Sequence, residues 1–138
     1  MGEFEIIDKH FAREVHRNDV VLGVGDDAAL VDVGAGHCMV CAMATAGDVA
    51  MDDSAAPGFA RELFRTACDR LAARGAAPAW FTLSLSLPEP RDAWLEGFSR
   101  ALNEAVSGHG AALVGGDTTR GPLVVTLVAH GAVPGDTL

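Results

Sequence analysis

The sequence is poor in basic residues and in cysteine. Only 10 of its 138 residues are lysine or arginine, against 19 aspartates and glutamates, which gives a formal net charge of −9 at pH 7. Clustered cations hold nucleic-acid phosphates, so this balance argues against a nucleic-acid partner. No apolar run reaches the roughly 20 residues that span a bilayer, and the first residues lack a basic and then apolar leader. We therefore expect a cytoplasmic protein without a membrane partner.

The three cysteines indicate neither a disulfide framework nor a metal finger. Cys38 and Cys41 form a CxxC pair, but they lie in HCMVCAMA, a strand-like stretch in which residues three apart face opposite sides. No second pair completes a zinc site. We expect these cysteines to be buried as small hydrophobes. The five histidines are scattered, and packing or surface roles are expected for them.

Hydrophobic periodicity predicts an α+β fold with helices packed on one face of a mixed sheet. We expect one domain spanning 1–138, long enough to bury a core. The first two strands should form a hairpin through the glycines at 34 and 36. The final VPGDTL reads as the start of a connection, so we expect a piece of a longer protein. Helices are predicted over 2–13, from about 54 to 74 and over 92–107, and strands over 19–33, 35–45, 78–88, 111–116 and 122–133.

The motif GVGDDA interrupts the first strand with two carboxylates. Gly23, Gly25 and Ala28 satisfy the dinucleotide-binding spacing GxGxxG/A. That motif requires a helix directly after it, whereas ALVDV follows and reads as strand, which argues against a Rossmann site. Adjacent aspartates are costly to bury without a counter-charge. The remaining readings for Asp26 and Asp27 are a capped turn or a cation site.

The motif GGDTTRG follows the fourth predicted strand. Gly115 and Gly116 allow close backbone approach, and Asp117 can bind a metal. Thr118 and its neighbour Thr119 can form hydroxyl hydrogen bonds, and Arg120 can hold phosphate in a bidentate fashion. The alternative is an Asx-type hairpin turn with a surface arginine.

Together these stretches resemble a known family. GEFEII, GVGDDAAL, LAARGAAPAWFTLSLSLPEPRDAWLEGFSRAL and LVGGDTTRGPLVVTLVAHGAVP, in that order, are similar to the amino-terminal half of bacterial thiamine-monophosphate kinase. This family is part of the aminoimidazole-ribonucleotide-synthetase-like superfamily. The resemblance implies ATP- and magnesium-dependent phosphorylation of thiamine monophosphate to thiamine diphosphate. It also implies an amino-terminal ATP-binding domain that pairs through its sheet into a homodimer, and a carboxy-terminal domain that this chain lacks.

The resemblance assigns roles to particular residues. It implies that magnesium is bound by Asp26, Asp27 and Asp117. We expect the side chains near positions 27 and 117 to converge on a polyphosphate. The resemblance also implies that the nucleotide is bound by Gly115, Gly116, Thr118 and Arg120. No catalytic side chain is assigned.

The sequence also departs from the family pattern. Met43 and Arg70 stand where the family has metal-binding aspartates, and Ala50 stands where it has a substrate-binding histidine. Arg70 either replaces a metal as counter-charge or points to solvent. The 138-residue chain alone is expected to be inactive, since phosphoryl transfer needs positioning from all sides. The alternatives are a non-catalytic dimerisation or scaffold domain and a sibling enzyme acting on another phosphate or carbamoyl substrate. A homodimer is also favoured by the long last strand, whose edge would otherwise be exposed.

Overall fold

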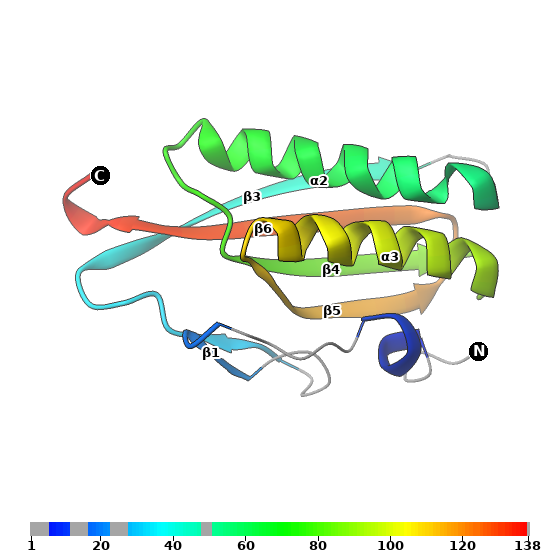
Figure 1. Cartoon of the computed structure of the whole chain (residues 1–138), viewed down its shortest axis with the longest axis horizontal. Helices are drawn as coiled ribbons and strands as arrows, with labels where there is room; N and C mark the ends of the chain where they lie inside the picture. The colour runs from blue at the N-terminus through cyan, green and yellow to red at the C-terminus, as the bar shows by residue number, and fades with distance from the viewer. Residues whose placement is uncertain (1–5, 12–16, 23–27, 48–50, 138) are drawn as a thin grey trace.

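A four-stranded mixed sheet with two helices on one face forms the body of the protein (Figure 1). The computed structural model describes residues 6–11, 17–22, 28–47 and 51–137. The strand order is β3-β6-β4-β5, with β4 and β5 parallel and β6 antiparallel to both of its neighbours. The predicted fold class is therefore confirmed. No helix in the described ranges is long and apolar enough to cross a membrane.

The elements have the following bounds. The sheet consists of β3 (His37–Gly47), β4 (Trp80–Leu87), β5 (Ala112–Arg120) and β6 (Val124–Pro134). The two helices that cover it are α2 (Ala56–Ala72) and α3 (Asp92–Gly108). A small separate sheet pairs β1 (Val20–Leu22) with β2 (Leu30–Val31). Single turns are η1 (Ile7–Phe11), η2 (Asp53–Ala55) and η3 (Gly135–Thr137).

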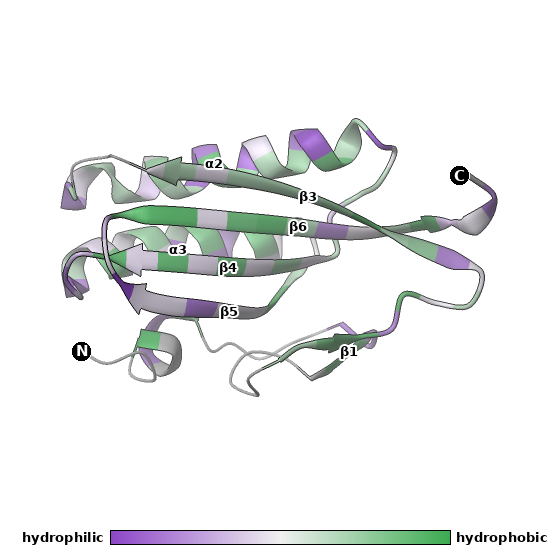
Figure 2. Ribbon diagram, turned by 180° about the vertical axis from the view of Figure 1, so that it is seen from behind, coloured by the Kyte–Doolittle hydropathy of each residue, from purple (hydrophilic) through white to green (hydrophobic). Residues whose placement is uncertain are grey.

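Alternation along β4 builds the centre of the core. Every second side chain faces the helices, and all four that do so are buried: Phe81, Leu83, Leu85 and Leu87. The helices meet them with the predicted stripes, in which Leu63, Ala67 and Leu71 of α2 are buried and Phe59 is half-buried. Gly75, with a positive φ of 79°, ends the turn after α2, as glycine does most readily. Seen from behind, the other face of the sheet carries no helix formed by the described residues (Figure 2).

The predicted hairpin between 19–33 and 35–45 is wrong. Segment 19–33 folds back on itself, because β1 pairs antiparallel with β2. The positive-φ residues Gly34 and Gly36 then carry the chain out to β3, which pairs along its length with β6. β3 has 11 residues and can form more main-chain hydrogen bonds with β6 than with the short strands β1 and β2.

The polar stretch 117–120 lies inside a strand and not in a turn. β5 continues past Gly116 to Arg120, and residues 121–123 connect it to β6. Since β5 and β6 flank β4 and do not pair with each other, the alternative of a hairpin turn at 117–120 is wrong. β6 is consequently an inner strand. The expectation of an unpaired edge along it, which favoured a homodimer, is wrong too; the sheet edges are β3 and β5.

The two cysteines of the CxxC pair face opposite sides of β3, as the alternation predicts. Cys38 is half-buried and packs against the main core under the helices. Cys41 is exposed on the helix-free face, so its predicted burial is wrong. The sequence pattern marks that strand as apolar but does not show that one of its faces lacks a cover.

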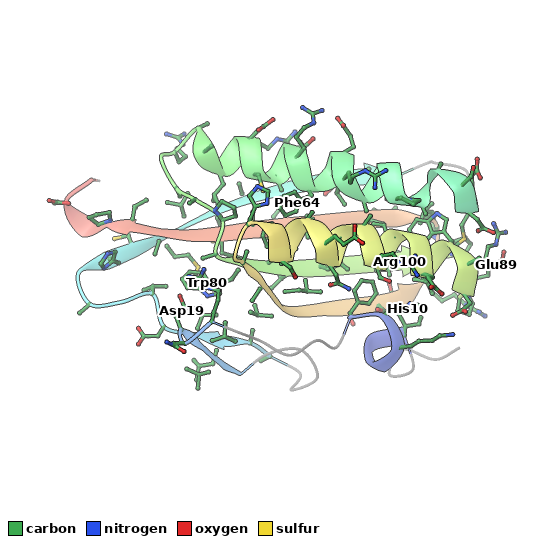
Figure 3. The ribbon with its side chains drawn as sticks, in the orientation of Figure 1. His10, Asp19, Phe64, Trp80, Glu89 and Arg100 are labelled. Carbon is green, nitrogen blue, oxygen red and sulfur yellow. The ribbon has the colours of Figure 1, made fainter. Side chains whose placement is uncertain are left out.

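The amino-terminal turn η1 is fixed on α3 (Figure 3). His10 is buried, its Nε2 lies 3.2 Å from Asp92 Oδ1, and its main-chain oxygen accepts a 3.1 Å hydrogen bond from Asn103 Nδ2. Phe11 is buried against α3. Of the helix predicted over 2–13, the structure describes residues 6–11, in which Ile7–Phe11 form one π-helical turn that lies against the body with Phe11 buried. Phe4 of the predicted stripe falls outside the described residues, so the full length of this helix stays a prediction.

Candidate functional site

One line of side chains across the helix-free face is polar on every strand. The pairing register places Thr45 of β3 opposite Thr126 of β6, Thr126 opposite Ser84 of β4, and Ser84 opposite Asp117 of β5. Paired residues of neighbouring strands face the same side, so three hydroxyls and one carboxylate form a continuous row, here called the hydroxyl row. The Oγ1 atoms of Thr45 and Thr126 lie 2.8 Å apart. Asp117 is exposed at the edge of this row.

Sequence reasoning missed three members of the hydroxyl row. The alternation in FTLSLSL already places Ser84 on the face opposite the buried leucines, which is a usable signal. Thr45 and Thr126 carry no such signal. They are 81 residues apart in the chain, and only the pairing of β3 with β6 brings them together.

The predicted nucleotide-binding side chains face the opposite side of β5 from the predicted metal ligand Asp117. Thr118 and Arg120 pair with Leu85 and Leu87, so they face the helix side, where Thr118 is half-buried and Arg120 is exposed. Asp117 faces the other way. Because β5 is an edge strand, a ligand at this edge has access to both sides. The nucleotide contacts of Thr118 and Arg120 stay a prediction.

The two glycines of GGDTTRG differ in what surrounds them. A Cβ built on Gly116 would lie 2.2 Å from the main-chain oxygen of Leu83, so the backbone pairing itself requires glycine there. A Cβ on Gly115 would meet Ala29 Cβ at 3.6 Å and Thr82 Cγ2 at 3.8 Å, which are ordinary contacts. Gly116 therefore has a structural reason of its own, and the nucleotide contacts of both glycines stay predictions.

Of the three predicted metal ligands, only Asp117 lies among the described residues. Asp26 and Asp27 lie outside the described residues, so their convergence with Asp117 stays a prediction. Ala29, two residues further on, lies beside β5 at Gly115. Over the described ranges, no three His, Cys, Asp or Glu side chains gather as a metal site. Asp117 and the neighbouring hydroxyls are the hard oxygen donors that Mg²⁺ prefers, so they fit this ion as part of a larger ligand set.

A charged pair and an indole fix β1 to the start of β4. Arg17 Nη2 donates to Asp19 Oδ2 at 2.8 Å, and Trp80 Nε1 donates to Asp19 Oδ1 at 3.1 Å (Figure 3). The Arg17 guanidinium carbon lies 5.6 Å from the centre of the Trp80 ring. Val20 and Val31 pack on the same indole cluster. The described segments on either side of 23–27 are thus held against the sheet.

Asp19 should make stability depend on pH. The hydrogen bond from Arg17 holds the pKa of Asp19 below its usual value near 4, with smaller help from Trp80. The carboxylate therefore stabilises the fold above that usual value, and this contribution is lost as pH falls through the lowered pKa. We expect Asp19→Asn to lower the free energy of unfolding by about 1 kcal/mol at pH 7 and the difference from wild type to shrink below about pH 4. Urea unfolding from pH 7 to pH 3 measures both.

The matched control for that measurement is Glu96→Gln. Glu96 accepts from Arg100 at 2.7 Å, but both side chains are exposed on α3, so the change should have almost no effect at any pH. An Asp19→Asn difference that stays constant down to pH 3 would contradict the assignment of the stabilisation to the ionised carboxylate.

Arg70 is tied to Met43. Its Nη1 donates to the main-chain oxygen of Met43 at 2.7 Å, which links α2 to β3, and both side chains are exposed. Arg70 therefore does not simply point into solvent. It forms no ion pair with the carboxylates of the described segments, so its role as a counter-charge stays a hypothesis.

The fold and the hydroxyl row together define an α+β domain that presents oxygen ligands on an open sheet face. The sequence matches the family described as AIR synthase related protein, N-terminal domain, over residues 25–133, and the chain belongs to this family. The resemblance drawn from GDDAAL and GGDTTRGPL is thereby confirmed at the level of the family.

The curated relatives with similar sequences are thiamine-monophosphate kinases. The Escherichia coli (strain K12) enzyme is 42% identical over 136 residues, covering 96% of this chain and 42% of that protein. The crystal structure of the Stenotrophomonas maltophilia K279a enzyme has a TM-score of 0.81 and 39% identity, covering 97% of this chain and 43% of that one. A structure of AaThiL complexed with AMPPCP and TMP has a TM-score of 0.65 at 18% identity, covering 95% and 41%, and supports the fold alone. The chain thus spans less than half the length of these relatives.

Proposed function

We propose that this chain is the amino-terminal, nucleotide-binding domain of a thiamine-monophosphate kinase. The complete enzyme transfers the γ-phosphoryl group of ATP to the phosphate of thiamine monophosphate. The observation that carries the proposal is Asp117 at the end of the hydroxyl row, within GGDTTRGPL, in a chain 42% identical to the Escherichia coli kinase. The AaThiL relative was solved with an ATP analogue and TMP, which agrees with these two ligands.

The proposed roles follow from the chemistry of phosphate. Magnesium, held by Asp117 with Asp26 and Asp27, supplies the positive charge that phosphoryl transfer requires. Ser84 and the other hydroxyls of the row donate hydrogen bonds to phosphate oxygens, and Gly115 leaves space for the phosphates at β5. Thr118 and Arg120 contact the nucleotide from the helix side of the edge. Because the chain spans 42% of the Escherichia coli enzyme, we expect catalysis to need the remaining length as well.

The test is calorimetric titration of AMPPCP with Mg²⁺ into the wild-type chain and Asp117→Asn. Removing the carboxylate charge should weaken nucleotide binding about tenfold or more, since hydrogen bonds and ligation to charged groups are the stronger ones. Asp136→Asn is the matched control. It makes the same change at an exposed aspartate in η3, at the opposite end of the molecule from the tip of β5 (Figure 1). Equal affinities for Asp117→Asn and wild type would refute the site.

We propose further that two chains pair through their helix-free sheet faces. Met39 and Met43 of β3 and Val124 of β6 are 40%, 56% and 37% exposed on this face, so pairing would remove these three apolar side chains from water. We expect sedimentation velocity at micromolar concentration to show a dimer and Met43→Glu to shift it towards monomer. Val21→Glu, at an exposed valine of β1, is the control. A wild-type monomer would contradict the pairing.

A non-catalytic scaffold is the second candidate. Met43 and Arg70, at the two positions where the resemblance implies aspartates, bind each other in this chain and provide no carboxylate. A chain that dimerises but gives no heat with AMPPCP, with or without Mg²⁺, would be the scaffold.

A further inference from the structure

A thiol and an imidazole meet on the helix-free face of the sheet, away from the hydroxyl row. Cys41 of β3 lies directly opposite His130 of β6, and its Sγ is 3.4 Å from His130 Nδ1. The two residues are 89 positions apart in the chain, so no local pattern in the sequence indicates the pair. From the sequence, only packing or surface roles are expected for the histidines, so this contact with a thiol was not predicted.

The imidazole is oriented by a third strand. His130 Nε2 lies 3.1 Å from the Oγ1 of Thr82 on β4. When Nε2–H donates to this hydroxyl, the lone pair of Nδ1 faces the sulfur of Cys41. A hydrogen bond to the far nitrogen is the usual way in which proteins orient a metal-binding histidine.

The spacing of the two donor atoms fits one shared ion. Zinc binds thiolate sulfur at about 2.3 Å and imidazole nitrogen at about 2.0 Å, and a tetrahedral angle between these bonds separates the donors by about 3.5 Å. The separation of 3.4 Å between Sγ and Nδ1 therefore allows an ion to bind with little movement of either strand. Cys41 is exposed, so the ion can reach the sulfur.

We propose that Cys41 and His130 form a binding site for a thiophilic cation such as Zn²⁺, with Thr82 orienting the histidine. In the part of the chain that the structure describes, no third His, Cys, Asp or Glu side chain joins them. Water, or the same pair from a second copy on this face, completes the usual four-coordinate shell.

This site selects a different ion from the one assigned to Asp117. Thiolate and imidazole are ligands for zinc and copper(I), whereas Mg²⁺ requires oxygen ligands. Cys41 and Thr45 are four residues apart on one strand, which separates the two sites by about 13 Å along β3. The inference does not depend on the proposed kinase function.

The test is titration of the reduced full chain with Co²⁺, followed by the thiolate-to-cobalt absorption band, and then displacement of Co²⁺ by Zn²⁺. We expect the band in wild type and its loss in Cys41→Ser and in His130→Gln. Thr82→Val should weaken binding by about 10- to 100-fold, as outer-shell changes do. Cys38→Ser is the matched control, because Cys38 belongs to the same strand and faces the helices.

The stoichiometry and the variants decide the outcome. Saturation at one ion per chain, or at one ion per two chains, with loss in Cys41→Ser supports the site. A band that persists in Cys41→Ser, or no band in wild type, overturns it. Cys41→Ser is the decisive variant, because the Cys41 side chain is exposed in the single chain and its loss should cost little stability. Circular dichroism confirms that the variant is folded.

Discussion

Replacing Gly116 by alanine is expected to lower the free energy of unfolding by at least about 3 kcal/mol, at the upper end of the cost of overpacking. The added Cβ would lie 2.2 Å from the main-chain oxygen of Leu83 and 3.2 Å from its carbonyl carbon. Main-chain atoms of a central strand cannot turn aside as a flexible side chain can. The parallel pairing of β4 with β5 would have to open, which removes a large share of the roughly 5–15 kcal/mol that stabilises a domain. Urea unfolding measures the loss.

Gly115→Ala is the matched control for that change. Its Cβ would meet nothing closer than Ala29 Cβ at 3.6 Å, so we expect a change of less than about 1 kcal/mol. If Gly115 approaches the phosphates as proposed, the same variant should weaken AMPPCP binding while leaving stability intact. Equal stability losses for the two variants would show that the contact with Leu83 does not explain Gly116.

This pair of glycines shows what a motif leaves out. From the sequence alone, GGDTTRG assigns both glycines to the nucleotide. A sequence shows where a residue lacks a Cβ, but it does not show which atoms an added Cβ would contact. The collision at Gly116 arises from β4, more than 30 residues earlier in the chain. Sequence reasoning therefore had no access to the structural reason for that residue.

The elements that the sequence predicted correctly are those with a strong local period. The alternation in β4 and the helical stripe of α3 depend only on neighbouring residues, and both are confirmed with their buried faces. The pairing of β3 is different. Gly34 and Gly36 indicated a turn correctly, but a turn does not decide which strand the chain meets next. That choice depends on hydrogen bonds with β6, which begins 77 residues after Gly47.

The same limit applies to the candidate site. Asp117 was predictable because a carboxylate beside two glycines and two threonines is chemically unusual within apolar strands. The hydroxyl row and the pair of Cys41 with His130 were not, because each member looks ordinary by itself. The Cys41–His130 pair and the Thr45–Thr126 part of the row both arise from the register in which β3 pairs residue by residue with β6. A single-residue slip of that pairing would change which side chains stand opposite one another along these strands.

Phe98→Ala is expected to lower the free energy of unfolding by about 3–5 kcal/mol, the usual cost of removing a buried aromatic ring. Phe98 is fully buried on α3, and its ring stacks on Trp94 with centroids 5.0 Å apart and planes 9° apart. The ring centroids of Phe59 on α2 and Phe11 on η1 lie 6.0 and 6.4 Å from the centroid of the Phe98 ring. Removing it takes away the shared contact of three segments. Denaturant unfolding at pH 7 gives the loss directly.

The control for this change is Phe59→Ala. Phe59 is only half-buried, so its loss should cost clearly less than that of Phe98. Because Phe11 depends on the Phe98 ring, Phe98→Ala should also speed hydrogen exchange in 6–11 more than in β4, whereas Phe59→Ala should not. If both variants lose the same stability and leave exchange in 6–11 unchanged, Phe98 does not connect η1 to the core, and the polar contacts of η1 with Asp92 and Asn103 must hold that segment.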